Sequence, residues 1–348
     1  MVRLLQPIEP LTHMRQTILL IFSFLCTFSY GQDKALIQKI SSIDDSIKVG
    51  NLVVYNAFKY QVLAHQNSQY DTSIIVDKVY RPHPQLWDSC LALIFGDAGK
   101  IFRQTGTIEW NRTLFEKQPQ LLKKLDTLSN LNLDSLFNSH LKAIVKLTGL
   151  QPNGKWILYL GPDQSFSFEI GGCSSNGMAI DLAHSKITAS ILTEAMPHEF
   201  EHMVFEQAKK NDPDWGTDLG ATIDEGLACY FTYEYFKEKF PKWRVVEQMS
   251  KKQFQWYLDH EKEIFEKSLP YLTSNSDKNP YKCNCRASGC KKLFEKAPKT
   301  ICYFLGFRII EFYTKKHGKN SWTDAYKIPM KELVKQSGYS AYIKALRH

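Results

Sequence analysis

Apolar residues recur every three or four positions over much of the chain between residues 33 and 150. The clearest examples are LFEKQPQLLKKLDTLSNL (114–131) and LDSLFNSHLKAIVKLTGL (133–150). This spacing is typical of amphipathic helices, and Gly149 suits the end of the second one. The pattern therefore predicts a helical N-terminal region over residues 32–150.

The pattern changes near residue 155. Three short segments rich in β-forming residues and bounded by glycine or proline follow each other: KWILYLGP (155–162), SFSFEIGG (165–172) and GMAIDLA (177–183). Helical spacing then returns over 186–209, 224–240, 243–268, 299–317 and 329–337. We therefore expect an α+β fold that is predominantly helical, with one domain over 151–348 in which a small sheet packs on the helix over 186–209.

The first residues have the pattern of an export signal. An apolar run over 18–28 follows Arg15, and Ser29-Tyr30-Gly31 places small residues before a cleavage site at Gln32. We expect a signal peptide over 1–31, with Met14 as a possible true start and an uncleaved anchor as the alternative. No run of 18 apolar residues occurs later. This predicts an exported chain, periplasmic, bound to the cell envelope or secreted, without a transmembrane segment after cleavage.

Export changes how the eight cysteines are interpreted, because an oxidising compartment favours disulfides. Four cysteines lie within twenty residues of one another: Cys283, Cys285, Cys290 and Cys302. Their C-x-C-x4-C spacing lacks the C-x2-C of common zinc knuckles, which favours one or two local disulfides over a metal site. Cys90 and Cys229 lie among apolar neighbours and are predicted to be small buried residues.

The net charge of +8 arises from lysines interleaved with glutamates, as in EKEIFEKSL. No basic arm, zinc-finger spacing or RNA-binding motif accompanies it, so we expect no nucleic-acid partner. Attraction to an acidic surface, such as the cell envelope, stays open.

The most informative stretch is HEFEH, residues 198–202, which fits the pattern H-E-x-x-H. On a helix, His198 and His202 lie one turn apart on one face and can bind the same ion. Glu199 is rotated away from that face and can act as a general base for water at the metal. Pro197 requires that the helix begin or bend there. Glu201 and Glu206 are predicted to lie on a solvated face, although Glu206 could also contact the metal site, and Met203 and Phe205 are predicted to be core.

A catalytic zinc site needs a third protein ligand. Glu225 in DEGLA follows His202 after a loop with Pro213, Gly216 and Gly220, which allows the chain to turn back before a helix starting near Asp224. His198, His202 and Glu225 would bind one zinc ion and leave a fourth position open, as in metallopeptidases.

With these motifs the sequence resembles the gluzincin metallopeptidases. The segments FGD (95–97), GGC (171–173), MPHEFEH, DEGLACYF and CYFLGFRIIEFY more closely resemble a family of predicted bacterial zinc-dependent proteases, which includes relatives of a gliding-motility lipoprotein. The resemblance implies a zincin-like fold, the same three zinc ligands, and Glu199 as base. It also shows a departure: Cys229 stands where thermolysin-like gluzincins have an aspartate that orients a histidine. Asp181 or Asp224 would have to take that role.

The sequence thus predicts an exported zinc metallopeptidase that hydrolyses peptides or proteins, with Tyr303 or Tyr230 as an additional donor to the carbonyl oxygen. The alternative is a cell-envelope interaction protein that retains a zincin fold without turnover.

Overall fold

The computed structural model describes residues 34–66, 70–166, 168–174, 176–237, 239–270, 272, 296–298 and 300–346. The predicted signal peptide, with Met14, lies outside these ranges, and so do Cys283, Cys285 and Cys290. Buried apolar residues from all parts of the described chain form one continuous core.

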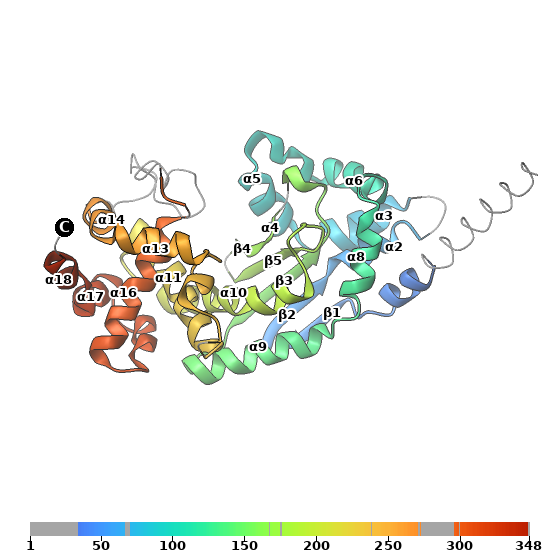
Figure 1. Ribbon diagram of the computed structural model, residues 1–348. Helices are drawn as coiled ribbons and strands as arrows, with labels where there is room; N and C mark the ends of the chain where they lie inside the picture. The colour runs from blue at the N-terminus through green and yellow to red at the C-terminus, as the bar shows by residue number, and fades with distance from the viewer. Residues whose placement is uncertain are drawn as a thin grey trace, which may run out of the picture.

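A five-stranded mixed sheet lies at the centre of the molecule, with strand order β1-β2-β3-β5-β4 (Figure 1). The strands are β1 Ser46–Val49, β2 Asn51–Asn56, β3 Asn153–Tyr159, β4 Ile170–Ser174 and β5 Gly177–Asp181. The three inner strands are parallel to one another, and each outer strand is antiparallel to its neighbour. β4 is therefore an edge strand, and β5 lies inside the sheet.

Two of these strands come from the region expected to be helical. β1 and β2 form a hairpin around Gly50. Its φ of 58° lies in the left-handed region, which glycine adopts readily because it has no side chain. β2 then pairs in parallel with β3, from Asn51 opposite Asn153 to Asn56 opposite Leu158. The proposed division into 32–150 and 151–348 stays a prediction, but the sheet contains strands from both sides of it.

Helices cover both faces of the sheet. On β3, the buried ring of Trp156 contacts Phe137 and Phe200 from two helices on one face. Tyr159 projects from the same strand toward Trp87 on the other face. Because the inner strands are buried on both sides, they read as nearly continuous apolar runs.

Three helices match the periodicity predicted over 114–150: α7 Leu114–Lys117, α8 Gln120–Leu128 and α9 Leu133–Thr148. Before them lie α2 Ala57–Leu63, α3 Thr72–Ile74, α4 Pro84–Leu86, α5 Ala92–Ile94 and α6 Gln104–Arg112, with π-helical turns at Ile75–Tyr80 and Trp87–Leu91 and a 3-10 turn at Gly96–Phe102. Gly149 ends α9 in the left-handed conformation, as expected.

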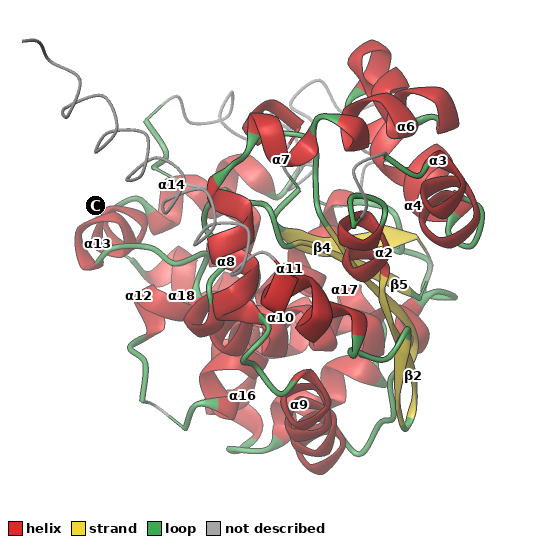
Figure 2. Cartoon of the chain, turned by 90° about the vertical axis from the view of Figure 1, so that its right-hand side faces the viewer, coloured by secondary structure: helices red, strands yellow, loops and turns green. Residues whose placement is uncertain are grey.

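Helices predominate in the described part of the C-terminal half (Figure 2). Its helices are α10 Ala189–Lys209, α11 Asp218–Tyr235, α12 Lys242–Val245, α13 Lys251–Asp259, α14 Glu261–Ser268, α16 Ile301–His317, α17 Met330–Ser337 and α18 Tyr339–Ala345, with 3-10 turns at Gln164–Phe166 and Ser321–Tyr326. The mostly helical α+β prediction is confirmed. Among the described residues, no helix is both long enough and apolar enough to cross a bilayer.

Two helix predictions were wrong in detail. The helix expected over 243–268 is three helices. Glu247 and Gln248, both with φ of 50°, separate α12 from α13, and His260, whose backbone is not helical, separates α13 from α14. α11 begins six residues before Asp224, because the side chain of Thr217 accepts a hydrogen bond from the backbone N–H of Gly220 and caps it there.

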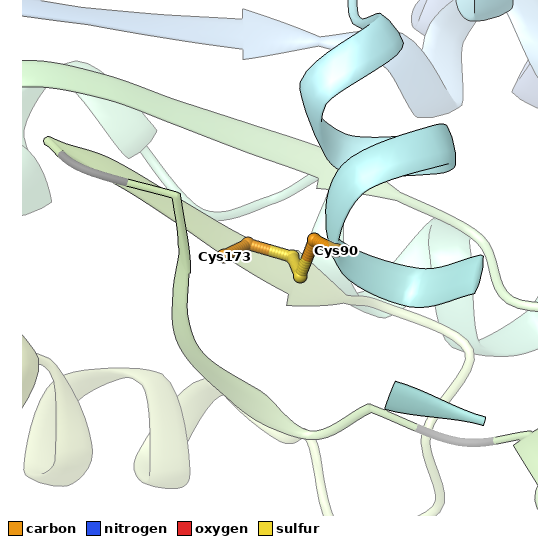
Figure 3. The surroundings of a disulfide bond; sticks show 2 residues. All are labelled: Cys90 and Cys173. Atoms are coloured by element: carbon orange, nitrogen blue, oxygen red, sulfur yellow. A yellow bond between two sulfur atoms is a disulfide. The ribbon is translucent and has the colours of Figure 1, made fainter. Parts of the chain in front are cut away.

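Cys90 is buried, as predicted, but its disulfide was not predicted. Cys90 forms a disulfide with Cys173, which joins the π-helical turn Trp87–Leu91 to the edge strand β4 (Figure 3). Cys173 lies at an irregularity in the pairing of β4 with β5. Cys229 is free and buried, as predicted, and Cys302 is disulfide-bonded.

Candidate metal centre

The two histidines of HEFEH lie in the middle of α10, which packs between the sheet and the C-terminal helices (Figure 1). The helix begins well before Pro197, where Thr188 accepts a hydrogen bond from the N–H of Ile191, close to the start of the helical spacing predicted over 186–209. Pro197 therefore lies inside α10, and of the two possibilities, a helix that begins or bends at Pro197, the structure excludes the first. One turn separates His198 from His202, and their ring centroids are 4.6 Å apart.

The third residue comes from α11, which packs against α10. Its Glu225 Oε2 lies 3.2 Å from His198 Nε2 and 3.4 Å from His202 Nε2, and the two Nε2 atoms are 3.0 Å apart. The sequence predicted that these three residues bind one ion, and in the structure their three ligand atoms form one triangle.

The triangle fits a zinc ion. Tetrahedral ligands at about 2.0–2.1 Å from a metal lie roughly 3.3 Å from one another, close to the three distances observed. Histidine Nε2 and carboxylate oxygen are ligand types that zinc accepts.

Asp224 fixes the orientation of His202. Its Oδ1 lies 2.7 Å from His202 Nδ1. A proton on Nδ1 donates to this carboxylate and leaves the Nε2 lone pair free to face Glu225. Asp224 thus occupies the role that the sequence had left open between two aspartates.

Asp181, the other aspartate considered for that role, lies elsewhere in the fold. It is buried at the end of β5, where its Oδ1 accepts hydrogen bonds from the N–H groups of Gly161 and Ala183 at 2.7 and 2.8 Å. Burial raises its pKa to about 6 against the lowering effect of these bonds. Its function is to hold the loop after β3, not a histidine.

The electrostatics of the site favour a bound cation. Burial lowers the pKa of His202, but the carboxylates of Asp224 and Glu225 outweigh burial and raise that pKa well above its usual value. Conversely, burial raises the pKa of Glu225, and the two histidines more than reverse this effect. The pair of carboxylates therefore stabilises positive charge at this point.

Glu201 does not lie on a solvated face, contrary to expectation. It is fully buried and accepts a hydrogen bond from Tyr326 Oη at 3.0 Å. Burial, reinforced by the nearby Asp224 carboxylate, raises its pKa well above normal. The signal was in the sequence: Pro197, Val204 and Phe205 share its helix face and are buried.

Glu199 lies on the side of α10 toward the edge strand. A Cβ built on Gly171 of β4 would lie 3.7 Å from Glu199 Oε2. The carboxylate therefore faces the space between the histidines and the strand, as a general base requires.

Tyr303 reaches the same place from α16. Its ring stacks on His198 with centroids 5.9 Å apart. Burial, together with the charge of Glu225, raises the pKa of its phenol well above normal, so the hydroxyl keeps its proton and remains a donor. Tyr230, the alternative donor, instead packs against Phe307 and Trp322.

Two contacts position α16. Thr300, before its first turn, donates from its N–H and its hydroxyl to the carboxylate of Glu247 at 2.9 and 3.1 Å. Further along, Gly306 crosses Gly226 of α11 so closely that a Cβ on Gly226 would lie 2.1 Å from backbone of Gly306. This crossing brings Tyr303 beside Glu225.

Two cavities meet at the triangle. We call the first, of about 580 Å³, the Glu199 cavity, because it contacts His198, Glu199 and Tyr303. The second, of about 400 Å³, contacts His202, Asp224 and Glu225 and is named the His202 cavity. Glu206 is half-buried and lines the His202 cavity, so only part of its surface is solvated.

The edge strand passes both cavities. Ile170 lines the Glu199 cavity, and Gly172 and Cys173 line the His202 cavity. β4 therefore borders both cavities, and Gly177 and Met178 of β5 also line the His202 cavity.

A histidine pair on one helix and a glutamate on the next, with the carboxylate of Glu199 beside them, define a candidate site of the zinc peptidase class. Residues 163–335 match the model of a protein family described as "Predicted Zn-dependent protease (DUF2268)". The matched stretch contains the sheet edge, all three candidate ligands, Glu199 and Tyr303. No curated protein and no solved structure matches the chain.

Proposed function

We propose that this protein is an exported zinc-dependent peptidase that binds an extended peptide along β4 and hydrolyses it beside His198, His202 and Glu225. The observation that carries the proposal is the convergence of three ligand atoms within 3.0–3.4 Å, with Glu199 turned toward the edge strand.

The substrate would add to the sheet. An edge strand offers backbone N–H and C=O groups to an extended peptide, and β4 passes from one cavity to the other. A peptide paired with β4 has one side chain on each side of the triangle, and its scissile carbonyl lies next to Glu199.

Zinc bound here would supply the Lewis acidity that makes water nucleophilic at neutral pH and polarises the carbonyl. Glu199 accepts the proton of the attacking water and delivers it to the leaving amine. The hydroxyl of Tyr303 donates to the carbonyl oxygen as negative charge develops there. Asp224 holds His202 in the tautomer that leaves Nε2 free.

Export is part of the proposal. The apolar run over 18–28 has the features of a signal peptide, and the Cys90–Cys173 disulfide is the kind of bond that persists in an oxidising compartment.

Glu199→Gln tests the chemistry directly. Glutamine keeps the size of glutamate but cannot accept the proton, so cleavage of a peptide library should fall by roughly 10²- to 10⁴-fold. Zinc content, measured on the purified protein, should stay near one per chain, because Glu199 is not a ligand.

Glu194→Gln is the matched control. It makes the same change on the same helix and in the same cavity, at a carboxylate that pairs with Arg244 at 2.6 Å, and it should change the rate far less. Equal cleavage by wild type and Glu199→Gln would show that Glu199 is not the base. A wild type that binds no zinc would contradict the proposal altogether.

A further inference from the structure

Several of the large apolar side chains that are exposed lie together in one cavity. Among the described residues five such side chains are exposed: Leu93 (66%), Ile94 (49%), Leu269 (48%), Trp215 (38%) and Leu150 (37%). Leu93, Ile94 and Trp215 all line the His202 cavity. Exposed apolar side chains that cluster in a cavity mark a binding site more often than scattered ones do.

The three side chains come from separate segments. Leu93 and Ile94 lie on α5, and Trp215 lies in the loop between α10 and α11, where its ring packs against Phe205 at a centroid distance of 6.2 Å. Their convergence on one cavity is a product of the tertiary fold and not of one apolar stretch of sequence.

The wall formed by α5 is held in place. The Cys90–Cys173 disulfide ties the turn before it to β4 (Figure 3). Behind it, Gly99 packs so tightly that an added Cβ would lie 2.1 Å from the carbonyl oxygen of Ala92. Leu93 and Ile94 therefore remain exposed on a fixed support beside the edge strand.

The remaining lining is mostly apolar or acidic, apart from Ser89 and His202. Met178 and Met203 are buried in the cavity wall, and Glu206 contributes a carboxylate near His202. The lining contains no lysine or arginine. An apolar side chain would cover Leu93, Ile94 and Trp215, whereas an acidic one would lie beside three carboxylates, those of Glu206, Asp224 and Glu225.

We infer that the His202 cavity is the specificity subsite, which accepts a bulky apolar side chain next to the scissile bond of a peptide substrate and rejects an acidic one. This inference rests on the proposed function for the identity of the ligand as a peptide. Leu93 and Ile94 lie outside the stretch that matches the family, so this chain's own N-terminal region sets the preference.

Peptides that differ at one position, with Leu, Ala or Asp on either side of the cleaved bond, measure the preference. We expect a kcat/KM for Leu at least about 10-fold above that for Ala at one of the two positions, and lower still for Asp. The double variant Leu93→Ser/Ile94→Ser should reduce the Leu-to-Ala ratio by roughly 10-fold.

Leu150→Ser/Leu269→Ser is the matched control, because it removes two exposed leucines that do not line either cavity. Its Leu-to-Ala ratio should equal that of the wild type. An unchanged ratio in Leu93→Ser/Ile94→Ser, or an equal loss in the control, would overturn the inference.

A binding measurement separates this inference from the proposed function. Fluorescence anisotropy of the same labelled peptides on the zinc-loaded Glu199→Gln protein reports affinity without turnover. Tighter binding of the Leu peptide than of the Asp peptide, lost when Leu93→Ser/Ile94→Ser is added, supports the subsite even if no peptide is cleaved. Equal binding of both peptides refutes the subsite, even if cleavage depends on Glu199.

Discussion

The two cavities that meet at the metal triangle differ in chemistry. The Glu199 cavity carries charged side chains that pair with each other, Arg244 with Glu194 and Lys186 with Glu169. The His202 cavity has no lysine or arginine in its lining and exposes Leu93, Ile94 and Trp215. The groups that can move protons or donate to a carbonyl, Glu199 and Tyr303, lie only on the charged side.

This difference suggests a division of work between the two sides. In the Glu199 cavity, paired charges and fixed donors would stabilise the charge that develops during hydrolysis. In the His202 cavity, the exposed apolar side chains would bind the substrate by burying apolar surface. Three substitutions test whether the two sides can be changed separately.

The largest effect is expected from Tyr303→Phe, on the Glu199 side. Removing one donor to a developing oxyanion costs roughly 10²- to 10³-fold in kcat. We expect kcat to fall by this amount, while the preference between Leu and Ala peptides stays as in the wild type. Steady-state kinetics on the paired peptides measure both.

Zinc affinity distinguishes two roles for Tyr303. If the phenol acts only on the substrate, the affinity for zinc stays unchanged. A weaker zinc affinity that parallels the loss of rate would show instead that Tyr303 positions Glu225, with which it interacts.

An intermediate effect is expected from Cys90→Ser/Cys173→Ser, on the His202 side. A disulfide that closes a long loop contributes about 2–4 kcal/mol to stability, and this one spans 83 residues. The free energy of unfolding, measured with denaturant, should fall by about that amount. The Leu-to-Ala selectivity should fall as well, because the disulfide supports the apolar wall. Unfolding identical to that of the wild type would show that the bond does not form in the folded protein.

The smallest effect is expected from Asp224→Asn, at the junction of the two cavities. Loss of a carboxylate that orients a metal-binding histidine typically weakens the metal by roughly 10- to 100-fold. Competition with a chelator of known affinity measures this change. Asp181→Asn is the control, since the side chain of that buried aspartate accepts from the backbone N–H groups of Gly161 and Ala183, and it should leave zinc affinity unchanged.

The candidate metal site was predictable because it depends on local spacing. His198 and His202 share a face of any helix that contains them, and Glu225 needed only a loop that returns. The sequence named both Asp224 and Asp181 as candidates for the carboxylate that orients a histidine, but the choice between them depended on where α11 begins. That start is set by the cap at Thr217, and the alternative of a helix beginning near Asp224 was equally compatible with the apolar pattern.

The sheet was less predictable because its pairing is not local. β3 and β5 appeared as short β-rich runs, but β1 and β2 lie in a region whose average pattern is helical, and the hairpin at Gly50 is only eleven residues from Ser46 to Asn56. The edge position of β4 follows from strand order, which no single segment encodes. The Cys90–Cys173 bond has the same origin, because it joins segments 83 residues apart.

The parallel pairing of β2 with β3 also has a consequence for biogenesis. About a hundred residues separate these strands, and contacts this distant in sequence form late, because the long loop must close first. α10 packs against β3 and β4, which precede it in the chain, and α11 with Glu225 packs against α10. The three candidate metal ligands can therefore meet only after the chain has been made through Glu225, with both sides of the sheet already available to pair.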